Sequence, residues 1–130
     1  MTRLLLCTAM ILALTASANT QSSAATLLGA RMIAPPLEYD RPYEGHLVVM
    51  RGDANVMKAL CPKSAFPVTL GCARRYEKKN YCIVYIADDD ILKKASFPYE
   101  AVHRHEVGHC NGWPTDHKGS RPYSSRDESR

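Results

Sequence analysis

The 130-residue chain has no long hydrophobic run after its first residues, and it has no concentrated basic patch. The apolar run Leu4–Ala16 is shorter than the about 20 residues that a membrane-spanning helix needs. Basic residues outnumber acidic ones by 17 to 13, but they are scattered apart from Arg74–Lys79, which Glu77 interrupts. We therefore expect no stable membrane insertion and no nucleic-acid binding.

Two common metal-binding patterns are also missing. The cysteines never form the C-x-x-C pairs that a four-cysteine zinc site usually contains. The three consecutive aspartates Asp88–Asp90 lack the alternating D-x-D-x-D-G spacing of a calcium loop. We interpret these aspartates as a solvated turn.

The N-terminal residues predict export. Arg3 precedes the apolar run, and Ala16-Ser17-Ala18 follows it with the small residues that signal peptidase reads. Residues 1–18 are therefore predicted to be a cleavable signal peptide, with cleavage as late as residue 25 as the alternative. The expected destination is the periplasm or the cell exterior.

Export also indicates that the cysteines of the domain form disulfides. Removing the signal peptide removes Cys7 and leaves four cysteines, which in a small exported domain predict two disulfides. Three connectivities are compatible with the sequence, and we favour Cys61–Cys72 together with Cys82–Cys110.

The rest of the chain predicts one small α+β domain. Residues 19–45 are expected to be an extended, proline-rich lead-in, residues 46–117 the domain, and residues 118–130 a polar, frayed tail. A strand is expected at 46–50, followed by a short helix capped by Asp53.

The second half of the domain should hold a hairpin and a longer helix. Runs at 66–75 and 80–87 predict an antiparallel hairpin. A helix should begin near Ser96–Tyr99, with Ser96 as its cap, and end at Gly112. The expected architecture is an antiparallel sheet packed on this one helix.

That helix carries the pattern HExxH at residues 105–109. His105 and His109 are four residues apart, so both imidazoles lie on one helix face and can reach one metal ion. Glu106 lies beside them, where it can take a proton from a metal-bound water without being a ligand. The spacing therefore predicts a hydrolytic zinc site.

The stretch from His105 to His117 resembles the zincin metallopeptidases, most closely the metzincin pattern HExxHxxGxxH/D of snapalysin-type proteases. The resemblance implies zinc bound by His105 and His109, Glu106 as general base, and Gly112 as the turn that returns the chain beneath the metal.

The motif departs from that family in two ways. Thr115 occupies the position of the third ligand, so the ligand must come from a later residue: His117 is the first choice, Asp116 the second and Glu128 a distant third. The methionine-containing turn of metzincins is missing, because no Met follows residue 57.

The leading hypothesis is an exported zinc-dependent metallopeptidase that acts on a peptide or protein substrate. The alternatives are a non-catalytic metal-binding module and a disulfide-stapled binding protein without metal. Tyr85 and Ile86 are candidates for a substrate-aligning strand edge. We expect Trp113 to be a core residue, His103 to be no ligand, and Gly108 to let the helix approach the sheet.

Overall fold

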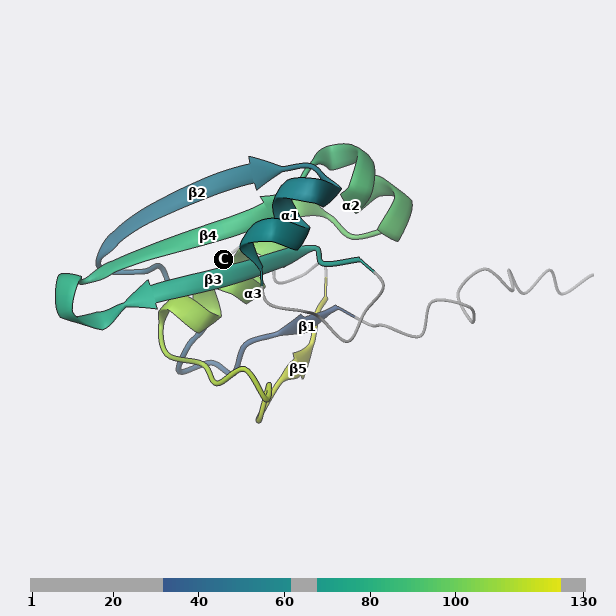
Figure 1. The fold of residues 1–130 in the computed structure, drawn as a ribbon. Coiled ribbons are helices and arrows are strands. Elements are labelled where there is room, and N and C mark those ends of the chain that lie inside the picture. The colour runs from purple at the N-terminus through teal and green to yellow at the C-terminus, as the bar shows by residue number, and fades with distance from the viewer. Residues whose placement is uncertain (1–31, 62–67, 125–130) are drawn as a thin grey trace, which may run out of the picture.

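The computed structural model describes residues 32–61 and 68–124, which form a small α+β domain. Its main sheet has the strand order β2-β4-β3, with bounds β2 His46–Gly52, β4 Tyr81–Ala87 and β3 Gly71–Tyr76 (Figure 1). The β3–β4 pair is antiparallel, which confirms the predicted hairpin. The strand β2, however, runs parallel to β4, so the sheet is mixed rather than wholly antiparallel.

Helices cover both faces of this sheet. On one face lies α3 (Tyr99–Cys110), which the disulfide Cys82–Cys110 fastens to β4. On the other lies α1 (Ala54–Leu60), where the disulfide Cys61–Cys72 joins the end of α1 to β3 (Figure 1). Both predicted disulfides are therefore confirmed, and each one fixes a different face of the sheet.

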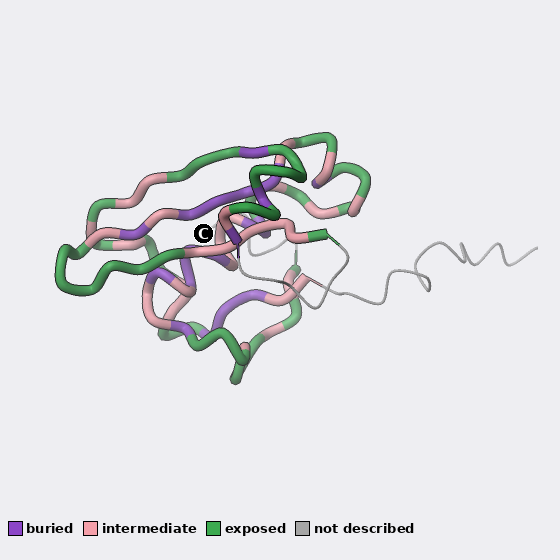
Figure 2. Tube along the Cα trace, viewed as in Figure 1, coloured by how far each residue is buried: buried purple, intermediate pink, exposed green. Residues whose placement is uncertain are grey.

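The core lies where β4 meets the two flanking helices (Figure 2). Val84, Ile86 and Val102 are fully buried between the sheet and α3, and Met57 is buried on α1. These apolar contacts fix the orientation of α3, because its buried residues include Val102 and Val107.

Local signals explain where most helices begin. The Asp53 side chain accepts hydrogen bonds from the backbone N–H groups of Asn55 and Val56, so the predicted cap of α1 is confirmed. The expected turn at the three aspartates is wrong, because Asp89–Ala95 forms the helix α2. Aspartates in the first helical turn complement the positive end of the helix dipole, and Leu92 anchors α2 in the core.

The helix α3 begins at Tyr99, within the predicted range, but its predicted cap is wrong. Ser96, with φ +60°, terminates α2, and Pro98 takes the position before the first residue of α3. The end of α3 agrees with the sequence, since Gly112 follows with φ +103°, a backbone conformation that glycine adopts readily.

A second, two-stranded sheet joins the lead-in to the tail. The strand β1 (Ile33–Ala34) pairs antiparallel with β5 (Arg121–Pro122). The lead-in is thus extended at β1, as expected, but Arg121 and Pro122 are ordered rather than frayed because they pair with it. The predicted signal peptide and the end of the tail lie outside the described residues.

Within the parts of the chain that the structure describes, no helix has both the length and the apolar character needed to cross a membrane. The two disulfides are typical of proteins that fold in an oxidising compartment.

Candidate metal centre

Three imidazoles converge at the C-terminal part of α3. His105 and His109 come from one face of the helix, and His117 comes from the loop that follows it. The Nε2 atom of His105 lies 3.1 Å from that of His117, and the Nε2 atom of His109 lies 3.3 Å from each of the other two. Each residue therefore offers one ligand atom to a single point, and the three could hold a metal ion.

The distances among the three Nε2 atoms fit a metal ion with tetrahedral coordination. Metal–nitrogen bonds of about 2.0–2.1 Å at tetrahedral angles place neighbouring nitrogens about 3.3–3.4 Å apart. The observed separations of 3.1–3.3 Å are close to those values. Three protein nitrogens would then occupy three corners and leave a fourth for water or substrate.

Hydrogen bonds at the Nδ1 atoms of His105 and His109 orient the Nε2 atoms of these rings toward each other. Nδ1 of His105 lies 2.9 Å from the Ile33 carbonyl oxygen, and Nδ1 of His109 lies 2.8 Å from the Trp113 carbonyl oxygen. A carbonyl can only accept, so in each neutral ring Nδ1 carries the proton and Nε2 presents a lone pair. With these tautomers the two Nε2 atoms cannot hydrogen-bond to each other, and both lone pairs are available to a shared cation.

The rings are also held in the protonation state that binds metal. The pKa of His105 is lowered to about 4, chiefly by burial, against the hydrogen bond to Ile33, with smaller contributions from the neighbouring rings of His109 and His117. Burial is also the largest cause of the lowered pKa of His109 and of His117. Neutral imidazoles are the form that ligates metals.

A turn delivers His117 despite its late position in the sequence. The His117 N–H donates to the Pro114 carbonyl oxygen at 3.1 Å, and His117 itself has φ +58°. Asp116, the second choice, is exposed and accepts a hydrogen bond from the Lys118 N–H, so it does not join the three imidazoles. Glu128 lies outside the described residues.

Glu106 lies on the face of α3 that packs against the sheet, and only 6% of its surface is exposed. Burial raises the pKa of its carboxyl group to about 8. The side chain lies against Gly71 of β3: a Cβ at Gly71 would lie 2.6 Å from Oε1 of Glu106. Gly71 therefore makes room for the carboxylate.

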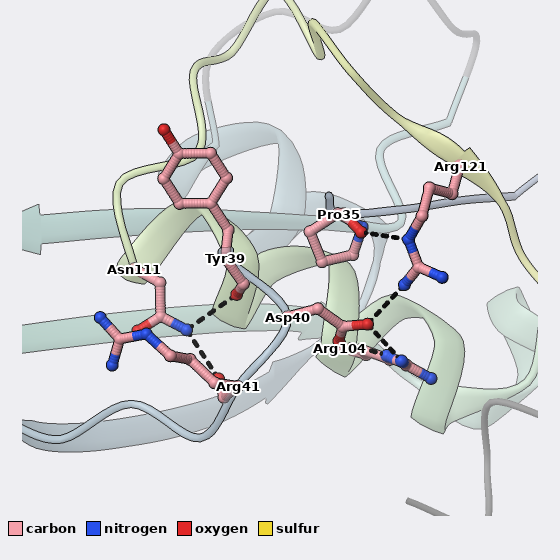
Figure 3. Close-up of polar contacts among 7 residues, drawn as sticks. All are labelled: Pro35, Tyr39, Asp40, Arg41, Arg104, Asn111 and Arg121. Carbon is pink, nitrogen blue, oxygen red and sulfur yellow. Dashed lines mark hydrogen bonds and ion pairs between the residues drawn. The ribbon is translucent and has the colours of Figure 1, made fainter. Parts of the chain in front are cut away.

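The lead-in is fastened to α3 and β5 by polar contacts (Figure 3). Asp40, whose side chain is 6% exposed, accepts hydrogen bonds from both Arg104 and Arg121. Arg121 also donates to the Pro35 carbonyl oxygen at 3.0 Å, and Asn111 donates to two carbonyl oxygens of the lead-in. These contacts hold the segment that contains Ile33 against the three imidazoles of the candidate metal centre.

Sequence reasoning missed Ile33 and Asp40 and gave Trp113 only part of its role. Trp113 is buried, as expected, but it lies against all three imidazoles. The single tryptophan beside a helix end was the one local signal. Gly108 does not face the sheet: a Cβ there would meet Pro35 at 2.7 Å and Trp113 at 3.3 Å.

Two further expectations concern the surroundings of the site. Tyr85 and Ile86 lie on β4, which is the central strand, so they cannot form a substrate-aligning edge. His103 stacks on Tyr99 and does not belong to the three-imidazole cluster.

Comparison with known proteins adds no relative to this geometry: no family model matches the chain, and neither the curated proteins nor the solved structures contain a significant match.

Proposed function

We propose that the chain is a zinc-dependent metallopeptidase that acts after export. The observation that carries this proposal is the convergence of three imidazole Nε2 atoms at 3.1–3.3 Å, together with the position of Glu106 directly after His105 in the sequence. Three nitrogen donors with an open fourth position are typical of catalytic zinc, whereas structural zinc sites are closed by four protein ligands.

The donor set favours zinc among the metals that imidazole binds. Imidazole suits zinc, copper, iron and nickel, and a tetrahedral arrangement is the one that zinc prefers. When bound, zinc lowers the pKa of a ligated water and polarises the substrate carbonyl. His105, His109 and His117 would hold it.

Glu106 supplies the acid–base chemistry. Its carboxylate would accept a proton from the attacking water at one Oε atom and then give that proton to the leaving amine nitrogen. The buried position already places its pKa near neutrality, which suits a group that must both take and release a proton near that pH. A bound cation nearby would favour the charged, proton-accepting form.

The neighbouring strand offers a place for an extended peptide. Within the described residues β3 pairs with β4 on one side only, so its other side carries backbone groups that can pair with a substrate. Gly71 on β3 lies against Glu106, so a peptide bound along β3 would pass close to the carboxylate.

A non-catalytic metal-binding module is the second candidate. The low exposure of Glu106, 6%, favours it, because a general base must reach a substrate-bound water. In that case the ion would fix the C-terminal loop against α3 and no bond would be cleaved.

The experiment compares the wild-type protein with Glu106→Gln and His105→Ala, all exported so that the disulfides form. Zinc content and cleavage of a mixed peptide library are measured on the same samples. We expect Glu106→Gln to keep its zinc while hydrolysis falls roughly 10²–10⁴-fold, because only the proton transfer is lost. His105→Ala should lose both zinc and hydrolysis.

Equal hydrolysis in the wild-type protein and Glu106→Gln would contradict the peptidase proposal. Zinc bound by the wild-type protein without cleavage of any library member would favour the non-catalytic module. A folded wild-type protein that retains no metal would exclude both.

A further inference from the structure

We propose that Trp113 is the positioning residue that orders the three imidazoles before a metal binds. This inference rests on the metal site of the proposed function. Trp113 is 2% exposed, and the centroid of its indole ring lies 5.0 Å from that of His105, 4.9 Å from that of His109 and 5.0 Å from that of His117. The Trp113 side chain thus packs against all three imidazoles, and we call this packing surface their floor.

The ring contacts differ in a way that fixes each imidazole. The plane of His109 is nearly parallel to the indole, at 12°, whereas His105 and His117 meet it edge-on at 70° and 68°. Stacked and edge-on arrangements are the favoured geometries for aromatic pairs. Rotation of any one imidazole about its χ2 angle would therefore break a favourable contact with Trp113.

Hydrogen bonds of Trp113 also hold His109 directly and His117 through the next residue. Its carbonyl oxygen accepts from Nδ1 of His109 at 2.8 Å, which leaves Nε2 free for metal. Its indole Nε1–H donates at 3.0 Å to the carbonyl oxygen of Lys118, the residue after His117. The indole thereby ties down the turn that brings the late third ligand into place.

The imidazoles need such a floor because their Nε2 atoms point at one another. The facing lone pairs of His105 Nε2 and His109 Nε2 repel each other without a cation, so these two imidazoles would turn apart in the metal-free protein if their rotamers were free. Holding them in place before binding removes an entropic and electrostatic cost that a metal would otherwise meet. A residue with only a packing role would stabilise the fold without changing the affinity for metal.

The test uses Trp113→Leu, which removes the floor, and Trp113→Phe, which keeps a ring but loses the indole N–H. Tyr85→Leu is the matched control, because Tyr85 is a buried aromatic of the central strand that shares the α1 face of the sheet with Cys72. For each exported protein we would measure thermal stability, Zn²⁺ affinity by chelator competition, and the visible absorption of bound Co²⁺, which depends on coordination geometry.

We expect Trp113→Leu to weaken Zn²⁺ binding roughly 100-fold and to change the Co²⁺ spectrum, and Trp113→Phe to weaken it roughly tenfold with a spectrum close to wild type. Tyr85→Leu should lower the melting temperature but keep the wild-type affinity and spectrum. Wild-type Zn²⁺ affinity in both Trp113 variants would overturn the proposal, and so would an equal loss of affinity in Tyr85→Leu.

If Trp113→Leu does not fold, the Zn²⁺ affinity of Trp113→Phe tests the proposal alone. Wild-type affinity in that variant then overturns the proposal. A folded wild-type protein that binds no Zn²⁺ overturns the metal site and this inference together. A wild-type protein that binds Zn²⁺ but hydrolyses nothing overturns the peptidase proposal alone, because the affinity comparison does not depend on activity.

Discussion

Nδ1 of His105 lies 2.9 Å from the carbonyl oxygen of Ile33, which precedes it by 72 positions in the chain. Ile33 belongs to β1, which pairs with β5 soon after His117, and Asp40 anchors the same segment to α3. The described part of the lead-in, residues 32–45, is therefore a structural part of the candidate metal centre. Loosening it should affect both folding and metal binding.

Asp40→Asn tests this coupling. The substitution keeps the size of the side chain but leaves Arg104 and Arg121 without their shared carboxylate, in a site where Asp40 is 6% exposed. We expect the free energy of unfolding to fall by about 2–3 kcal/mol, less than for a fully buried pair because both arginines are partly exposed. Zn²⁺ affinity should fall as well, since the Ile33 carbonyl is held less firmly.

Urea unfolding of the metal-free protein and a Zn²⁺ titration measure the two effects. Glu44→Gln is the control, because it removes an exposed ion pair with Arg41 and should change stability by less than about 1 kcal/mol. If Asp40→Asn behaves like this control, the lead-in is not coupled to the centre.

A second pair of variants identifies the third ligand. His117→Ala should weaken Zn²⁺ binding by more than the roughly 100-fold typical of losing an outer hydrogen-bond partner, because it removes a ligand atom itself. Asp116→Ala should keep the metal and lose only the hydrogen bond to the Lys118 N–H, at about 1 kcal/mol of stability. The opposite result in a chelator competition would make Asp116 the ligand.

The two disulfides should differ in their effect on the site. Replacing Cys82 and Cys110 by serine opens a link across 28 positions and should cost about 3–4 kcal/mol of stability, with weaker Zn²⁺ binding because Cys110 adjoins His109. Replacing Cys61 and Cys72 opens a link across 11 positions and should cost about 3 kcal/mol with unchanged Zn²⁺ affinity, since this disulfide lies on the face of α1. Equal effects on metal binding would show that general loosening, not position, matters.

Gly71→Ala should separate hydrolysis from metal binding. The added methyl would lie 2.6 Å from Oε1 and 2.9 Å from Cγ of Glu106, so the carboxylate must move. We expect hydrolysis to fall roughly 100-fold at unchanged zinc content, because a displacement of about 1 Å is enough to disrupt a catalytic geometry. The same substitution in the Glu106→Gln background is the control and should add no further loss; a full additional loss would place the effect elsewhere.

The hairpin, α3 and both disulfides could be predicted because their signals are local or few. Strands β3 and β4 are short strand-like runs around a polar turn, and four cysteines allow only three pairings. The helix α2 was missed because aspartate favours turns as well as first helical turns, and the burial of Leu92 decides between them. The parallel pairing of β2 could not be predicted, since an apolar pattern does not encode strand direction.

Part of the candidate site could likewise be predicted from the sequence, and part could not. His105 and His109 follow from helical spacing alone, and His117 follows from chemistry once Thr115 fails as a ligand. The support for these rings could not be predicted: Ile33 acts through a backbone carbonyl, which any residue could supply, and from a distant segment.

The pairing of β1 with β5 has a consequence for the order of events in folding. One strand precedes all three imidazoles in the chain and the other follows them, so the pair closes a loop that contains nearly the whole domain. Contacts of such long range form late, because the entropy of loop closure opposes them until the intervening chain is compact. A nascent or half-folded chain therefore has the three histidines but not their convergence, and the candidate metal centre forms only when the fold is complete.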